Sequence, residues 1–240
     1  MTELAYDLHI HSCLSPCADD DNTPNNIVNM ARLNALDIIA LTDHNTCKNC
    51  PAIMCAKDQL HLPLLVLPGM ELCTSEEIHV VCLFESLERA MAFDEYVDSR
   101  SMKILNRPEK FGNQLILNAL DEPIGFEEHL LVTATAISIA DVSDLMIHFG
   151  GAAFPAHIDR TSYSLLSSLG SFPAEYGFAA AEIADMGRYD GLRATHPILS
   201  QLRIVSNSDA HHLWDIAEGE QVMPVAERSA EAVLAYLAGR

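Results

Sequence analysis

Short apolar runs alternate with polar turns and amphipathic stretches along this chain. Apolar runs of about four to eight residues are typical of buried strands, and apolar residues at about every third or fourth position are typical of helices. The predicted strands are residues 4–10, 37–42, 64–67, 78–84, 152–155, 180–183 and 203–206. The predicted helices begin after Thr23 and cover residues 53–60, 86–99, 138–150 and 229–237.

Two of these helices carry terminal signals. Thr23 precedes Pro24, which is the order expected of an N-cap residue followed by proline at the first helical position. Ser138 and Asp141 resemble a capping box, and Gly150 follows as a helix end. The first signal places a helix after the apolar run 4–10, and the second places a helix before the run 152–155. Both agree with a repeating strand–helix pattern.

Buried strands that alternate with helices predict an α/β fold in which parallel strands are joined by crossover helices. Residues 1–240 are predicted to form one domain. Prolines and glycines interrupt residues 100–133, which predicts hairpins or loops there. We expect an inserted segment at about 90–133 to overhang the carboxyl ends of the strands and to contribute to substrate specificity.

Composition and charge restrict the possible functions. The chain has 240 residues, of which 49% are hydrophobic, and its formal net charge is −20. This charge predicts no nucleic-acid binding by a basic groove, and it leaves open a small anionic substrate captured by bound cations. Neither a signal peptide nor a long apolar run is visible, so no membrane association is expected. The seven cysteines favour reduced thiols in a cytoplasmic protein.

Five groups of histidine and carboxylate residues lie at the predicted strand ends. They are Asp7-Leu8-His9-Ile10-His11, Thr42-Asp43-His44-Asn45, Glu71 with His79, His157, and Asn207-Ser208-Asp209-Ala210-His211. Alternate residues of a strand share a face, so Asp7, His9 and His11 are predicted to point the same way. A lone pair of strand histidines is more often a partly exposed pair than a metal site. Five groups at strand ends, however, favour convergence on one face of the fold.

The number of these side chains predicts more than one metal ion. Six histidines together with Glu71 and Asp209 exceed the roughly four ligands that a single zinc ion takes. Two or three ions would use them all, with Glu71 as a plausible bridge between two ions. Ions about 3.5–4 Å apart would suit displacement at phosphorus.

The same five motifs, in this order between residues 7 and 211, resemble those of the PHP (polymerase and histidinol phosphatase) family, in its stand-alone phosphoesterase form. The resemblance implies a distorted (β/α)7 barrel with a trinuclear centre at the carboxyl ends of its strands. It also implies a metal-dependent hydrolase that cleaves a phosphoester of a small phosphorylated molecule with zinc, manganese or iron.

The resemblance further implies how the ligands are shared. The implied sets are His9, His11 and Asp209 for a first ion, Glu71 as a bridge with His79 and His157 for a second, and His44 and His211 for a third. Family members often add an acidic ligand shortly after the first motif. Asp19 is the predicted residue for this role, with Asp21 or the thiolate of Cys17 as alternatives. Asp7 is expected to orient a ligand imidazole.

Four residues are expected to take part in catalysis: Glu71, Asp209, His211 and Arg160. Closely spaced cations lower the pKa of a bridging water and so generate hydroxide near neutral pH. Arg160 could bind a phosphoryl oxygen, or it could form a salt bridge with Asp159 or another acid.

Two other interpretations compete with this one. The chain could be a metal-binding PHP module without catalysis, with a structural or regulatory role. Cys13-x3-Cys17 and Cys47-x2-Cys50 could hold a separate zinc or iron–sulfur site, although packed, reduced thiols are the simpler expectation. The histidines without ligand-like spacing are expected to be structural or solvated: His61, His129, His148, His196 and His212.

Overall fold

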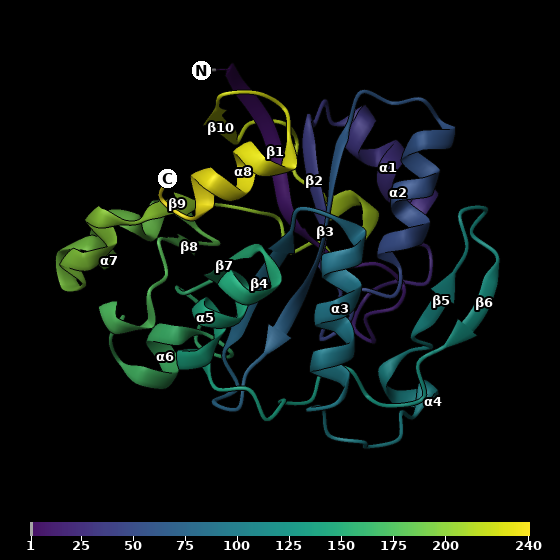
Figure 1. The fold of residues 1–240 in the computed structure, drawn as a ribbon, viewed down its shortest axis with the longest axis horizontal. Helices are drawn as coiled ribbons and strands as arrows, with labels where there is room; N and C mark the ends of the chain where they lie inside the picture. Colours follow the sequence, from purple (N-terminus) through teal and green to yellow (C-terminus); the bar gives the residue numbers. More distant parts are fainter. Residues whose placement is uncertain (1) are drawn as a thin grey trace.

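The computed structural model describes residues 2–240, and its centre is a curled, mixed six-stranded sheet in the order β10-β1-β2-β3-β4-β7 (Figure 1). Two further strand pairs, β5–β6 and β8–β9, flank it. The strands are β1 (Thr2–Ile10), β2 (Ile38–Leu41), β3 (Leu65–Cys73), β4 (His79–Phe84), β5 (Leu115–Leu117), β6 (Pro123–Phe126), β7 (Gly151–Pro155), β8 (Ala180–Glu182), β9 (Arg203–Val205) and β10 (Val222–Val225).

The five predicted helices are present, and the three shortest α-helices of the described residues were not predicted. The α-helices are α1 (Pro24–Leu33), α2 (Cys50–Gln59), α3 (Leu87–Asp98), α4 (Pro108–Phe111), α5 (Ile139–Phe149), α6 (Leu165–Leu169), α7 (Tyr189–Thr195) and α8 (Ala230–Leu237). Figure 1 shows α1, α2 and α3 along one side of the sheet and α8 near the start of β1. No described helix is long and apolar enough to cross a membrane.

The predicted terminal signals lie at the observed helix ends. The Thr23 side chain accepts a hydrogen bond from the Asn26 N–H at the start of α1, and Gly150 ends α5 in a left-handed conformation. Ser138 caps α5 as predicted, but a residue distant in sequence completes the cap. The Glu76 carboxylate accepts hydrogen bonds from the Ser138 hydroxyl, at 2.7 Å, and from the next backbone N–H.

Strand direction in the six-stranded sheet departs from the all-parallel expectation at β4 and at β10. The β1–β2, β2–β3 and β8–β9 pairs are parallel, whereas β4 runs antiparallel to both of its neighbours, β3 and β7. Residues 74–78 alone join β3 to β4, and a connection this short permits a hairpin but not a crossover. The antiparallel edge strand β10 was not predicted, because Pro224 and alternating exposure weaken its apolar pattern.

The sheet curls until the chain after β9 returns to β1. Ala210 and Ile10 form an isolated parallel bridge, and the His11 N–H donates to the Ala210 carbonyl at 3.0 Å. On the opposite side, the Ile158 N–H donates to the Glu182 carbonyl at 2.9 Å and links the end of β7 to β8. Across residues 2–240 the ladders form a half-barrel sheet with separate pairs, so the implied (β/α)7 barrel is not confirmed.

Apolar side chains pack on both faces of this sheet. One core lies between the sheet and helices α1, α2, α3 and α5, and the other fills the concave side and includes residues of β10 and α8. Phe84 and Phe93 are fully buried in the first core, and Phe154 is fully buried in the second. The two cores hold the strand ends in fixed positions.

The predicted irregular segment contains α4 and the β5–β6 hairpin. The hairpin is bound to the loop after β1, because the Leu115 N–H donates to the Cys13 carbonyl at 3.1 Å. Asn49, just before α2, also holds it, through its side-chain oxygen at 3.0 Å from the Leu117 N–H. The hairpin therefore packs against segments that directly follow β1 and β2.

Gly69 provides a test of the close β3–β4 contact. A Cβ atom at this position would lie 2.5 Å from the Cys82 carbonyl oxygen and 2.7 Å from Leu83. We expect Gly69→Ala to lower the free energy of unfolding by about 1–3 kcal/mol, because the two strands must separate. Thermal unfolding followed by circular dichroism measures this. Gly191→Ala is the control, since a Cβ atom there would meet no atom within 4 Å, and a midpoint equal to that of Gly69→Ala would contradict the prediction.

Candidate metal centre

Eight of the predicted ligand side chains meet in one cluster. They are His9, His11, His44, Glu71, His79, His157, Asp209 and His211. All are buried except His211, which is partly exposed. They come from the ends of β1, β2, β3, β7 and β9 and from the beginning of β4.

The reversed direction of β4 explains how His79 reaches this cluster. His79 is the first residue of β4 and pairs with Cys73, the last residue of β3. The start of an antiparallel strand therefore lies at the same edge as the ends of its parallel neighbours. His44 comes to the same place through a parallel bridge with Glu71.

A bulge in β1 sets the direction of its histidines. Between the pairs Asp7↔Ile39 and Ile10↔Leu41, β1 advances by three residues while β2 advances by two. The predicted common face of Asp7 and the two histidines is therefore wrong. Asp7 instead accepts hydrogen bonds from Ser208, at 2.6 Å from its hydroxyl, and does not orient an imidazole. It anchors the loop that carries Asp209 and His211.

Glu71 lies at the centre of the cluster, with imidazoles around both of its oxygens. Its Oε1 atom is 3.2 Å from His9 Nε2, 2.9 Å from His79 Nδ1 and 3.2 Å from His157 Nε2. Its Oε2 atom is 2.8 Å from His44 Nδ1. One carboxylate thus contacts histidines from most of the predicted motifs.

Asp209 occupies the other side of the β1 histidines. Its Oδ1 atom lies 3.1 Å from His11 Nε2 and 3.2 Å from His9 Nε2, and the two imidazole nitrogens are 3.3 Å apart. Arg160 donates to Asp209 Oδ2 at 2.6 Å, with its side chain 45% exposed. The structure thus shows the salt bridge to another acid that was one of the two expectations for Arg160.

These side chains fit divalent metal ions. Nitrogen and oxygen ligands at about 2.0–2.1 Å from a tetrahedral ion lie roughly 3.3 Å from one another, which matches the spacing seen here. Glu71 Oε2 and His44 Nδ1 are buried and lie 2.8 Å apart without a hydrogen bond that satisfies either atom, which a metal ion bound beside them would remedy. The groups able to surround an ion are His9, His11, Glu71 and Asp209; His44, Glu71 and His79; and His11, His44 and His211.

The pKa values of the clustered side chains indicate which of them carry charge. Burial opposes protonation of His9, but Glu182, Asp209 and Glu71 raise its pKa well above the usual value. Burial likewise opposes ionisation of Glu71, yet the surrounding imidazoles hold its pKa well below the usual range. For His11, burial and the neighbouring imidazoles together lower the pKa. The carboxylates therefore stay ionised and need positive charge beside them.

Glu182 supports His9 and was missed by the sequence analysis. Its carboxylate lies 3.0 Å from His9 Nδ1, accepts from the His157 backbone N–H at 2.8 Å, and accepts from the Asn207 amide at 2.7 Å. This carboxylate–imidazole contact leaves His9 Nε2 directed at the cluster. The sequence does contain a signal for this role, because Glu182 is the one acid in the apolar run 179–183. A charged residue buried in such a strand requires polar partners.

Two further contacts orient imidazoles in the same way. His11 Nδ1 donates to Ser15 Oγ at 2.9 Å, and this hydroxyl donates to Asp43 at 2.7 Å. His211 Nδ1 donates to the Asp209 carbonyl at 2.8 Å. Both arrangements leave the Nε2 atom as the free acceptor. Asp209 (φ 51°) has a left-handed backbone, a strained conformation that typically persists where surrounding contacts fix it.

The segment after β1 differs from the predicted ligand arrangement. Asp19 does not join the cluster, because its side chain turns toward His212, 3.5 Å away, and is 40% exposed. Asp21 is also exposed. Cys17 instead places its Sγ atom 3.2 Å from His44 Nε2. Burial raises the pKa of Cys17, but hydrogen bonds with His211 and His44 outweigh this and lower it to about 6.

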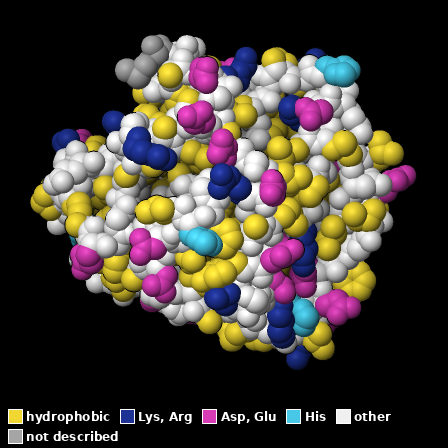
Figure 2. Space-filling model, in the orientation of Figure 1, with side chains coloured by type: hydrophobic (Ala, Val, Ile, Leu, Met, Phe, Trp, Pro, Cys, Tyr) yellow, Lys and Arg dark blue, Asp and Glu magenta, His cyan; other side chains and the backbone are white. Residues whose placement is uncertain are grey.

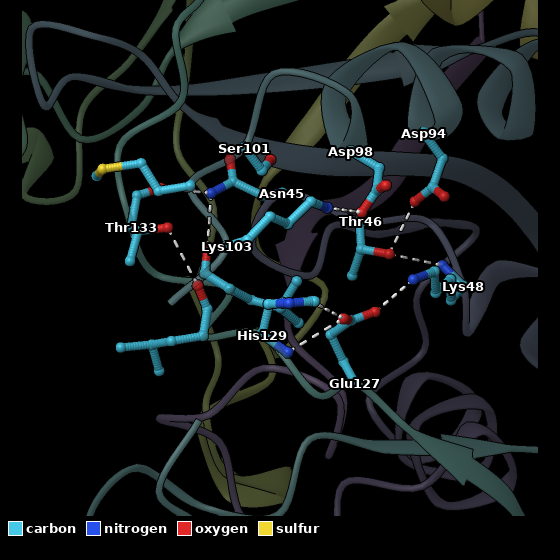
Figure 3. Close-up of a pocket in the computed structure, with 13 residues that line it drawn as sticks. Asn45, Thr46, Lys48, Asp94, Asp98, Ser101, Lys103, Glu127, His129 and Thr133 are labelled. Carbon is cyan, nitrogen blue, oxygen red and sulfur yellow. Dashed lines mark hydrogen bonds and ion pairs between the residues drawn. The ribbon is translucent and has the colours of Figure 1, made fainter. Parts of the chain in front are cut away.

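A small pocket adjoins the centre, and Figure 3 shows its lining residues. Asn45, next to His44, donates from its side-chain amide to the carbonyls of Leu131, at 2.6 Å, and Thr133, at 2.8 Å. The volume of this pocket is about 20 Å³, which is enough for roughly one water molecule. The pocket is therefore too small for a substrate. The Asn45 hydrogen bonds connect the end of β2 to the segment after β6.

No family model matches the chain, and no curated protein matches it. Solved structures do. The fold is similar to that of an endonuclease specific for DNA lesions, Endonuclease Q from Pyrococcus furiosus, with a TM-score of 0.68 and 19% identity over 99% of this chain. It is also similar to a protein from Bifidobacterium adolescentis assigned as a metal-dependent phosphoesterase, with a TM-score of 0.59 and 16% identity over 98% of both chains.

A third similar structure is an amidohydrolase from Chromobacterium violaceum, with a TM-score of 0.59 and 18% identity over 94% of this chain and 93% of that one. This chain has a PHP-like fold. It spans little more than half of the Endonuclease Q chains, 56% and 57% in two structures.

One of these structures corrects the expectation about partners. Endonuclease Q was solved with a 27-mer DNA duplex that has an abasic lesion at the active site. The exclusion of nucleic acid, and with it the restriction to a small phosphorylated molecule, is therefore wrong. The net charge is a sum over the whole chain. The electrostatic potential at a phosphate-binding site is set mainly by nearby charges, such as bound cations. On the face in Figure 2, basic side chains lie singly or in small groups among acidic ones.

The contact between Glu182 and His9 can be tested through metal affinity. We expect Glu182→Gln to weaken metal binding about 10–100-fold while the chain stays folded, because the amide orients His9 without a negative charge. Metal competition with a chromogenic chelator measures the affinity. Glu95→Gln, on the exposed face of α3, is the matched control. Equal affinities of the two variants would remove the supporting role assigned to Glu182.

Proposed function

We propose that this chain is a metal-dependent phosphoester hydrolase with two or three divalent ions at the cluster around Glu71. The observation that supports this most directly is the buried carboxylate with both oxygens facing imidazoles of different strands. A structural zinc site needs about four ligands and closes around them. Eight converging side chains serve more than one ion and leave coordination positions for a substrate.

The ligand assignment is the one that the family resemblance implies, and it is supported by the short distances from Glu71 to His9, His79 and His157. His9, His11 and Asp209 would hold one ion and Glu71 would bridge to a second near His79 and His157. Ions bound there supply Lewis acidity and activate water near neutral pH. Zinc, manganese and iron all suit this set of nitrogen and oxygen donors.

Residues of the chain then orient the reaction. Glu182 and Ser15 fix the rings of His9 and His11, so that the centre does not reorganise when charge develops. Arg160 lies beside Asp209 and is partly exposed, so its guanidinium can bind a non-bridging phosphoryl oxygen. The β5–β6 hairpin, bound to the loops after β1 and β2, would form one wall of the approach to the ions.

The proposal is tested with purified protein, a chelator and added Mn²⁺ or Zn²⁺. The substrates are phosphomonoesters, phosphodiesters and duplex DNA with an abasic site, since a protein of similar fold binds such DNA. We expect hydrolysis of at least one substrate, loss of activity with the chelator and recovery with metal. His157→Ala should lower the rate by at least about 100-fold, as expected for a lost ligand contact to the reacting charge.

Two outcomes would contradict the proposal. Metal-loaded protein without turnover on any substrate would favour a metal-binding module with a structural or regulatory role. Activity unchanged in His157→Ala would show that the hydrolysis does not arise at this centre.

Arg160 is tested separately. We expect Arg160→Gln to lower kcat/KM by about 100-fold with unchanged metal content, because a phosphoryl oxygen loses its charged donor. Steady-state kinetics and elemental analysis measure the two quantities. Arg193→Gln, in an exposed ion pair on α7, is the control. A loss of metal from Arg160→Gln would show that Arg160 acts by holding Asp209 instead.

A further inference from the structure

The loop after β1 places a sulfur atom where an oxygen ligand was expected. Cys17 Sγ lies 3.2 Å from His44 Nε2, whereas the Asp19 side chain turns toward His212 and Asp21 is exposed. A backbone hydrogen bond from the Asp19 N–H to the His211 carbonyl, at 3.0 Å, holds this loop against the cluster. This contact anchors the loop two residues after Cys17.

Three imidazoles lie close together near this sulfur, and two of them, His44 and His211, form hydrogen bonds with it. Ligand nitrogens of His11, His44 and His211 all lie within 4.8 Å of one another, and the rings of His11 and His211 stack with centroids 4.3 Å apart. The Nδ1 atoms of His11 and His211 are engaged by Ser15 and by the Asp209 carbonyl, so their Nε2 atoms carry free lone pairs.

His44 presents one ring nitrogen to this sulfur and the other to Glu71. Its Nδ1 atom lies 2.8 Å from Glu71 Oε2, and both atoms are buried without a hydrogen bond, which is rare for buried polar atoms. A cation on the Glu71 side would satisfy these two atoms. On the other side of the ring, Nε2 is the atom available to an ion beside Cys17.

We propose that Cys17, together with His44 and His211, binds a third metal ion through its thiolate and makes that position selective for zinc over manganese. This inference rests on the proposed metal centre, and it assigns the ligands and the metal preference of the third ion. On binding, the Cys17 S–H proton passes to solvent and the sulfur donates an electron pair to the ion. Thiolates favour zinc, whereas manganese favours oxygen ligands.

Three protein ligands leave one position open on a tetrahedral ion, as in catalytic zinc sites. Cys17, His44 and His211 would thus leave a coordination position of a bound ion available to substrate. With a sulfur ligand, this ion is expected to differ chemically from ions held by the two groups of nitrogen and oxygen ligands, which are His9, His11, Glu71 and Asp209, and His44, Glu71 and His79.

Cobalt(II) substitution tests the sulfur ligand without a substrate. Metal-free protein is titrated with Co²⁺, and the near-ultraviolet absorption that arises from sulfur-to-cobalt charge transfer is recorded. We expect this band in the unaltered chain and in Cys55→Ser, which removes the other exposed cysteine. Cys17→Ser should lose it while keeping the visible cobalt bands of the nitrogen and oxygen sites.

Cys17→Asp provides the matched variant for selectivity. It restores an anionic ligand without sulfur, so we expect the third ion to bind with the charge-transfer band absent. The zinc-over-manganese preference should fall at least about tenfold relative to the unaltered chain, as oxygen replaces sulfur. Competition between the two ions, followed by elemental analysis, measures it.

The outcomes separate this inference from the proposed function. A charge-transfer band that persists in Cys17→Ser, or an unchanged preference in Cys17→Asp, would overturn the role of Cys17. Cobalt bound without a sulfur band in the unaltered chain would also overturn it, but would leave the metal centre intact. A chain that binds no cobalt at all would contradict the metal centre itself.

Discussion

The structure depends on how a buried carboxylate is compensated. Glu71 is almost fully enclosed, and each of its oxygens lies within about 3 Å of an imidazole nitrogen. An isolated buried carboxylate would be strongly destabilising, so positive charge must be present at this point of the fold. In the metal-free chain the surrounding imidazoles can supply it, and divalent ions supply it more completely. Two apolar cores on the faces of the sheet hold the strands that bring these groups together.

Much of the centre could be predicted because strand ends are readable in a sequence. Apolar runs located β1, β2, β3, β7 and β9, and the polar residues after them converge as the geometry of parallel strands requires. His79 was predicted as a site residue on its motif, but the reason for its position is the hairpin that reverses β4. The predicted partner set was wrong, because net charge does not describe the local potential at a metal centre.

Other features depend on contacts that no local pattern records. The bulge in β1 adds one residue opposite β2, and a side-chain period of two cannot reveal it. Glu182 becomes a partner of His9 only after β8 lies beside the end of β7. Asp19 was chosen as the expected ligand, yet its side chain contacts His212, which is far away in the sequence. In each case the deciding contact joins segments that are separated in the sequence.

The short connection between β3 and β4 also affects the order in which the centre assembles. Glu71 and His79 are eight positions apart on one hairpin, so little loop-closure entropy is lost when they meet. His9 and Asp209 are separated by two hundred positions and meet only when nearly the whole chain has folded. The contact between Glu71 and His79 is therefore local and is expected to form early in folding. The contact between His9 and Asp209 is expected to form last.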